Sequence, residues 1–180
     1  DEKGQPLVQL NPEANGAAWF VDSVRMVDGP DAELAALGGL DNKRVAVVDK
    51  PFAAEVGDHI AAVADSTDTI AMTEYRVNLQ RYEYTTSSPR VAVFSEIYYP
   101  KGWTAWIEGK EVPYFRADYV LRAMVLPEGT HTVEFRFRAP HYTLLSTVTL
   151  ISSLILLAGV VAAVGVSGWR AYRKQKEDVE

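Results

Sequence analysis

Tyr142–Trp169 reads YTLLSTVTLISSLILLAGVVAAVGVSGW and contains no charged residue. Its most apolar part, 144–168, is about 25 residues long. A helix of that length measures ~37 Å, compared with ~30 Å for the hydrocarbon core of a bilayer. A buried core helix of a soluble protein rarely stays free of charge for so long. The stretch therefore predicts a transmembrane helix over 142–169.

Basic residues gather directly after this helix, at Arg170, Arg173, Lys174 and Lys176. Lys and Arg close to a membrane span favour the cytoplasmic side, whereas acidic residues contribute little. Arg136 and Arg138 precede the helix but belong to a predicted strand of a folded domain, which moves as a unit. We therefore predict a short cytoplasmic tail at 170–180 and an extracytoplasmic location for the domain before the helix.

Composition limits what the remainder of the 180 residues can be. Without the span and the tail, roughly 140 residues remain, which suffices for one domain with its own core. The net charge of −6 leaves no basic stripe for binding nucleic acid, and the absence of cysteine excludes disulfides and thiol chemistry. Because the first residue is Asp1, we expect a piece of a longer polypeptide or a mature form.

The region before the helix is rich in short β patterns. Residues 1–17 are polar and predict an extended lead-in, and 18–139 predict one β-rich domain. Apolar residues lie on both faces of 90–98, which is typical of a central strand. A helix at 31–37, capped by Asp31, is the only helical pattern in this domain.

Two turns have clear chemistry. Glu108-Gly109 fits a two-residue hairpin loop, and Pro127-Glu128-Gly129 joins two further strands. Together with the spacing of the other strands, these turns predict a mainly β fold, an antiparallel sandwich or jelly-roll-like domain with one short helix.

Residues suited to catalysis or metal binding are sparse. The three histidines, His59, His131 and His141, are scattered and lack the spacing of a zinc or catalytic site. No glycine-rich phosphate loop or serine nucleophile motif occurs. The sequence therefore predicts no cofactor, no metal and no catalytic residue.

Aromatic residues are unusually dense between 98 and 119. Two interpretations stand side by side: rings that fill a sandwich core, or a platform on which sugar rings stack while nearby carboxylates accept hydrogen bonds. The candidate carbohydrate contacts are Tyr98, Tyr99, Trp103, Trp106 and Tyr114.

Charged residues in the same region predict structural ion pairs. Asp118 lies close in sequence to Arg116 and Arg122, and a pair that organises a loop is favoured over an acid–base dyad. Glu96 interrupts an otherwise apolar strand, so a partly buried carboxylate there requires a cationic partner.

Three stretches carry a resemblance to a known family: SEIYYPKGWTAWIEGKEVP at 95–113, RADYVLR at 116–122 and LPEGTHTVEFRF at 126–137. They resemble the C-terminal region of the bacterial YfhO-like membrane proteins. The shorter pieces AWFV at 18–21 and VAVVD at 45–49 are similar to it as well. The resemblance covers most of the chain, including the closing helix.

The resemblance implies a polytopic enzyme of the GT-C glycosyltransferase type in the bacterial cytoplasmic (inner) membrane. Its upstream transmembrane helices would transfer a sugar from a polyprenyl-phosphate carrier to a cell-envelope glycopolymer. The catalytic carboxylate would lie in that upstream part, so no catalytic residue is assigned to this chain. The partners implied are the bilayer, those helices and an envelope glycan.

Two hypotheses about function follow. In the first, the chain is a non-catalytic extracytoplasmic module and membrane anchor of such a glycosyltransferase, in contact with the acceptor glycan. In the second, it is a single-pass scaffold whose β-sandwich binds another envelope protein. A free-standing envelope hydrolase is disfavoured because no dyad or metal set is recognisable.

Overall fold

The computed structural model describes residues 11, 14–58 and 65–177, without the side chains of 171, 172 and 174–177. The chain divides into two compact units, Asp1–Arg138 and Ala139–Glu180, and each is described by itself. Most of the predicted lead-in and His59 lie outside the described residues.

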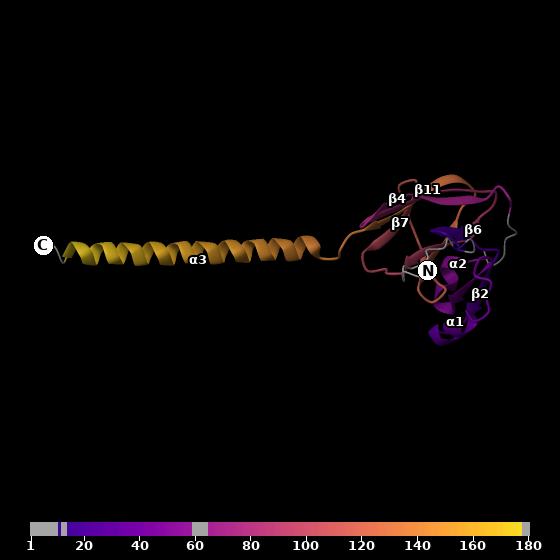
Figure 1. Ribbon diagram of the computed structural model, residues 1–180, viewed down its shortest axis with the longest axis horizontal. Helices are drawn as coiled ribbons and strands as arrows, with labels where there is room; N and C mark the ends of the chain where they lie inside the picture. The colour runs from indigo at the N-terminus through magenta and orange to yellow at the C-terminus, as the bar shows by residue number, and fades with distance from the viewer. Residues whose placement is uncertain (1–10, 12–13, 59–64, 178–180) are drawn as a thin grey trace, which may run out of the picture. The chain divides into compact units, whose positions relative to one another are not determined.

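Two antiparallel sheets form the sandwich (Figure 1). The four-stranded sheet has the order β1 (Ala18–Phe20), β6 (Arg90–Ile97), β10 (Leu121–Leu126), β9 (Phe115–Ala117). The five-stranded sheet has the order β4 (Thr69–Arg76), β5 (Leu79–Thr86), β11 (Gly129–Phe137), β7 (Trp103–Ile107), β8 (Lys110–Val112). The predicted mainly β, antiparallel fold is confirmed.

An aromatic core joins the two sheets. Phe94 from the four-stranded sheet packs edge to face against Tyr82 and Phe135 from the five-stranded sheet, with ring centroids 4.8 and 4.9 Å apart. All three side chains are fully buried. Edge-to-face pairs of this kind add about 0.5–1.5 kcal/mol each to the free energy of burial.

A third layer covers the other face of the four-stranded sheet (Figure 1). It consists of the strands β2 (Ser23–Val27) and β3 (Val45–Asp49) and the short helices α1 (Pro30–Ala36), η1 (Lys50–Phe52) and α2 (Ala53–Val56). Valines of this layer pack against the side chains of Val91 and Val93. Strand β6 is thus buried on both faces, as predicted for a central strand.

The third layer departs from the prediction in three ways. Strands β2 and β3 pair in parallel, because α1 forms a crossover between them. Residues 50–56 are helical, although the sequence predicted only one helix in this domain, at 31–37. Helix α1 has Gly29 at its N-cap and no side-chain cap, so the prediction that Asp31 caps it is wrong.

The two predicted turns are confirmed. Glu108 and Gly109 both have positive φ, 48° and 77°, as a type I′ hairpin between β7 and β8 requires. Gly129, with φ of 112°, joins β10 to β11. A close approach occurs in the loop before β7, where a Cβ on Gly102 would lie 2.7 Å from the Phe137 ring.

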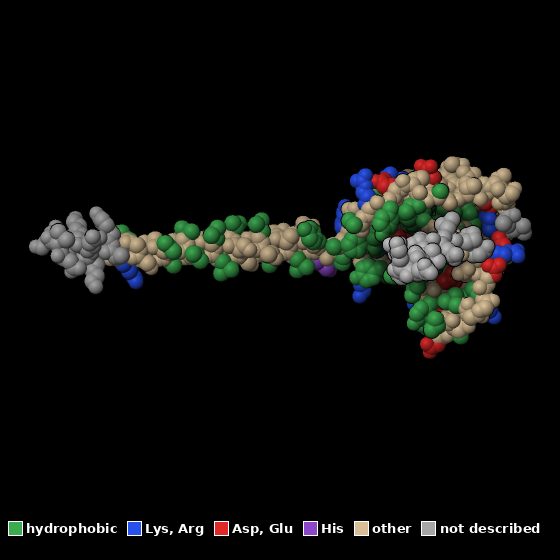
Figure 2. All heavy atoms as spheres, in the orientation of Figure 1, with side chains coloured by type: hydrophobic (Ala, Val, Ile, Leu, Met, Phe, Trp, Pro, Cys, Tyr) green, Lys and Arg blue, Asp and Glu red, His purple; other side chains and the backbone are tan. Residues whose placement is uncertain are grey.

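The second unit is the helix α3 (Tyr142–Glu177). Within the described residues, Tyr142–Arg170 is long and apolar enough to cross a membrane, with a mean hydropathy of 2.4. Its hydrophobic side chains are visible along its length in Figure 2. Hydroxyls such as those of Thr147 and Ser152 donate to backbone carbonyls four residues earlier, which satisfies polar groups without water.

Candidate functional site

The five predicted carbohydrate contacts do not form one platform. Along β7 the side chains alternate, so Trp103 points toward the sandwich core and Trp106 toward the outer face. Tyr98 and Tyr114 pack against each other with ring centroids 5.4 Å apart, and the Tyr114 ring also contacts Phe135. Both tyrosines therefore pack against other rings of the domain.

Trp103 is held from two sides. The Arg122 guanidinium lies 4.3 Å from the centre of its ring, and the Phe137 ring lies 5.3 Å away. The Tyr114 hydroxyl donates to the carbonyls of Trp103 and Tyr99, at 3.2 and 3.3 Å. Tyr99 remains exposed. This part of the aromatic cluster closes one end of the sandwich.

Trp106 lies in a surface groove of about 670 Å³, which we call the β7–β11 groove. Its indole Nε1 donates to Thr104 Oγ1 at 2.8 Å, which fixes the ring on the outer face of the sheet. The groove is lined by Asn78, Leu79, Pro100, Gly102, Trp103, Thr104, Trp106, Glu111, Arg136, Phe137 and Arg138. It brings the two predicted tryptophans together with exposed polar groups.

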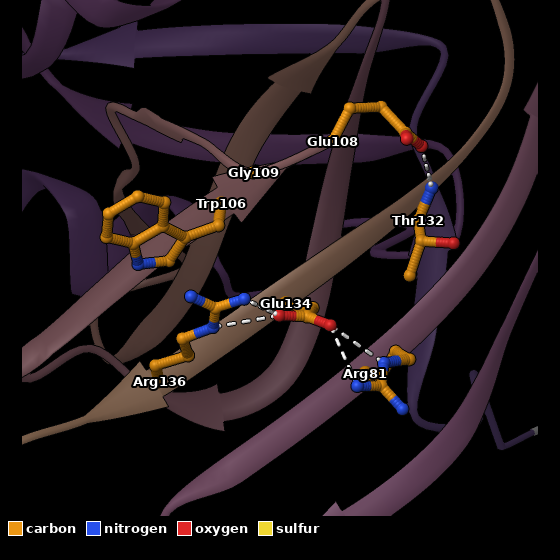
Figure 3. Close-up of a pocket in the computed structure, with 7 residues that line it drawn as sticks. All are labelled: Arg81, Trp106, Glu108, Gly109, Thr132, Glu134 and Arg136. Atoms are coloured by element: carbon orange, nitrogen blue, oxygen red, sulfur yellow. Dashed lines mark hydrogen bonds and ion pairs between the residues drawn. The ribbon is translucent and has the colours of Figure 1, made fainter.

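A second cavity of about 310 Å³ shares Trp106 and Arg136 with the groove (Figure 3). In it, Glu134 accepts hydrogen bonds from Arg136 Nε at 2.8 Å and from Arg81 Nε at 2.9 Å. Arg81 also pairs with Glu74. The Arg136 guanidinium lies 5.1 Å from the centre of the Trp106 ring. Adjacent strands thus assemble a fixed row of charges beside an aromatic ring.

The charge state of Glu134 follows from these contacts. Burial pushes the pKa of Glu134 upward, but the hydrogen bonds from Arg136 and Arg81 outweigh it and hold the pKa below its ordinary value. The carboxylate is therefore ionised at neutral pH and engaged on both oxygens. It is arranged for binding polar groups and not for donating a proton.

The predicted ion pairs form in a different pattern. Arg116 binds Glu33 at 2.7 Å and lies 3.5 Å from Asp49. Arg122 donates to Gln80 Oε1 and to the Ile97 carbonyl, at 2.8 and 2.9 Å. Among the described residues, neither arginine forms an ion pair with Asp118. That predicted pairing is wrong, because the partners come from strands and a helix distant in sequence.

Glu96 lies on the same face of its sheet as Arg122 and acts on it through space. Burial lowers the pKa of Arg122, and the charge of Glu96 opposes that shift. Within the described residues, Glu96 makes no ion pair at 4.0 Å or less. The predicted cationic partner of Glu96 is thus Arg122, which acts on it only through a longer-range electrostatic interaction.

Asp118 is buried and has an unusual environment. Its Oδ1 accepts from the Val47 backbone N–H at 2.8 Å, and its Oδ2 has no hydrogen-bond partner among the described residues. Burial raises the pKa of Asp118 to about 6, helped by the nearby charge of Glu33 and opposed by the Val47 hydrogen bond. Its φ of 50° marks a tight turn that fastens β9–β10 to β3.

Sequence reasoning missed two buried charge clusters. Arg90 is 2% exposed and binds Asp68 at 2.7 Å and Asp22 at 3.0 Å. Glu33, on α1, is fully buried and also accepts from the Tyr119 backbone N–H at 2.9 Å. The sequence did contain a signal for the first cluster, because Arg90 is the first residue of an otherwise apolar strand. Nothing in the local pattern of α1 indicated the second.

The described residues therefore define a three-layered β-sandwich with a polar–aromatic groove, followed by a helix that can cross a membrane. A family model described as bacterial membrane protein YfhO matches residues 41–149, which is more than half of the chain. The chain belongs to this family of membrane proteins. No curated protein and no solved structure matches the chain.

Proposed function

We propose that this chain is the extracytoplasmic, non-catalytic module and membrane anchor of a YfhO-like glycosyltransferase of the bacterial cell envelope. In this proposal the β7–β11 groove holds the acceptor glycan, and sugar transfer takes place in helices of the parent polypeptide. The observation that carries the proposal is the position of Trp106, an indole on the outer face of the sheet beside fixed charges.

The chemistry of the groove suits a carbohydrate. The apolar face of a pyranose stacks on an indole, while its hydroxyls require hydrogen-bond partners fixed in position. Arg136 and Glu134 are held by each other and by neighbouring strands, so little conformational entropy is lost when a ligand binds. Glu111 supplies a further acceptor along the groove.

The proposed orientation rests on the basic residues after the span, Arg170, Arg173, Lys174 and Lys176. With the tail in the cytoplasm, the sandwich lies on the outer side of the cytoplasmic membrane. An acceptor that is part of the cell envelope is found on that side. The orientation and the glycan-binding role therefore support each other.

A binding measurement tests the proposal. The full chain in lipid nanodiscs is immobilised and exposed to purified bacterial envelope polysaccharides, teichoic-acid-type polymers and peptidoglycan fragments. Trp106→Ala should weaken binding of the recognised polymer about ten-fold or more, because truncating a central aromatic contact typically costs ~1.4 kcal/mol or more. Trp106→Phe keeps an apolar ring and should retain most of the affinity.

The fold itself provides the control. Trp106 is only partly buried, so the far-ultraviolet circular dichroism of both variants, which reports the backbone, should match that of the unchanged chain. Equal binding by the unchanged chain and Trp106→Ala would refute the groove as the glycan site. Binding of no polymer, together with capture of a defined envelope protein, would favour the scaffold hypothesis.

A further inference from the structure

Exposed apolar side chains gather at one end of the sandwich. Strand β11 finishes there, so we call it the Arg138 end. It includes the turn at 77–78, the loop 98–102 and the turn at 118–120. Of the seven large hydrophobic side chains exposed on the described sandwich, six lie at this end: Tyr75, Val77, Ile97, Tyr99, Tyr119 and Val120.

Backbone hydrogen bonds hold these segments together. The Phe137 N–H donates to the Asn78 carbonyl at 2.9 Å, and the Arg138 N–H donates to the Gly102 carbonyl at 2.8 Å. The Tyr98 N–H donates to the Val120 carbonyl at 2.7 Å. The apolar side chains therefore project from one connected rim.

The two ends of the sandwich differ in chemistry. At the opposite end, the turns at 65–68, 87–89, 108–109 and 127–129 carry acidic and small polar residues and no large exposed hydrophobic residue. At the Arg138 end, Lys101 and Arg138 are exposed and form no ion pair with the described residues. This end is thus apolar and basic, whereas the other is polar and acidic.

The course of the chain indicates what covers the apolar rim. Helix α3 begins at Tyr142, four residues after Arg138, and four residues span at most about 14 Å. The first turn of a membrane-spanning helix lies at the interface of the bilayer, so the chain connection ties Arg138, the last residue of the sandwich, to that interface. Tyrosine with Lys or Arg is the composition that proteins place at this depth.

We propose that the Arg138 end of the sandwich is a membrane-contact surface. In this proposal, Val77, Ile97, Tyr99 and Val120 enter the interfacial region of the bilayer, and Lys101 and Arg138 contact lipid phosphates. The contact fixes the height of the domain above the membrane and keeps the nearby β7–β11 groove close to the lipid surface. The inference depends on the membrane span and does not require that the groove bind a glycan.

The absence of cysteine from the 180 residues permits a direct test with single-cysteine variants. Val77→Cys and Val120→Cys place a nitrobenzoxadiazole label on the rim, at side chains that are 91% and 45% exposed. Glu128→Cys, in the opposite turn, is the matched control, and Val160→Cys in the helix reports the bilayer core. The full chain is reconstituted in phosphatidylcholine vesicles with a minority of phosphatidylglycerol, with or without lipids that carry a doxyl quencher near the headgroup or, for the label at 160, near the end of the acyl chain.

We expect doxyl lipid to reduce the fluorescence of labels at 77 and 120 and to leave the label at 128 unchanged. Quenching at 160 confirms that the helix is inserted. Labels at 77 and 120 that behave like the label at 128, while 160 is quenched, would overturn the proposal. Labels at 77 and 120 that are shielded from both doxyl lipid and aqueous iodide would also overturn it, since protein would then cover the rim.

Discussion

Replacing Arg90 with methionine should destabilise the sandwich by about 3–5 kcal/mol, the usual cost of removing one partner from a buried ion pair. Arg90 is 2% exposed and neutralises two carboxylates, Asp68 at 2.7 Å and Asp22 at 3.0 Å. It also donates to the Val21 carbonyl at 3.0 Å. Methionine fills the space but leaves Asp68, whose side chain is 3% exposed, without its cation.

The measurement is urea unfolding of the full chain in detergent micelles, followed by tryptophan fluorescence. Arg44→Met is the matched control, because Arg44 binds the same Asp22 at 2.8 Å but its side chain is 70% exposed. Exposed pairs contribute little, so this variant should unfold almost like the unchanged chain. Adding Asp68→Asn to Arg90→Met should restore part of the lost stability. Equal midpoints for Arg90→Met and Arg44→Met would refute the assigned role.

Asp118→Asn should stabilise the protein by up to about 3 kcal/mol at neutral and higher pH and much less in acid. Burial raises the pKa of Asp118 from 3.8 to about 6 in the folded state. Well below pH 3.8 the Asp118 carboxyl is protonated in both the folded and the unfolded state, so it does not lower the free energy of unfolding. As the pH rises from 3.8 to about 6, the unfolded state loses its proton first, so the penalty on the folded state grows; above about pH 6 it stays constant.

Asparagine removes this penalty and keeps the oxygen that accepts from the Val47 N–H. It also tolerates the positive φ at position 118. The free energy of unfolding is measured by urea titration at several pH values on both proteins, and the difference is plotted against pH. Groups whose pKa is lowered in the folded state, such as Glu134, contribute equally to the stability of the variant and of the unchanged chain. Their contributions therefore cancel in the difference. A difference that is flat between pH 4 and pH 7 would contradict a raised pKa.

Local patterns were sufficient to predict much of the fold. The type I′ turn at Glu108-Gly109, the doubly apolar strand at 90–98 and the charge-free run at 142–169 each have a cause within a few residues. The burial of Val133 and Phe135 in β11 likewise follows the two-residue alternation of a strand. These features need no knowledge of the chain's long-range contacts.

The parts that could not be predicted depend on contacts between distant segments. Arg90 meets Asp22 across 68 residues, and Glu33 meets Arg116 across 83. The third layer, which buries the four-stranded sheet on its second face, likewise arises from a parallel strand pair. No local pattern reveals such partners.

The arrangement of the candidate site also could not be predicted from local sequence patterns alone. The density of aromatic residues allowed either a core or a platform, and strand alternation sends Trp103 inward and Trp106 outward. Tyr114 packs against Phe135 and donates to the Trp103 carbonyl at the end of the core. What remains for a ligand is the β7–β11 groove, where one outward indole lies beside the charges of β5 and β11.

The most direct test of the proposed function is a sugar-transfer assay on the intact polypeptide that carries this chain, with a polyprenyl-phosphate sugar donor and varied acceptor glycopolymer. If the groove positions the acceptor and the chemistry lies elsewhere, Trp106→Ala should raise the acceptor KM about ten-fold and leave kcat unchanged. An unchanged acceptor KM, or a kcat that falls at saturating acceptor while KM stays constant, would contradict the account.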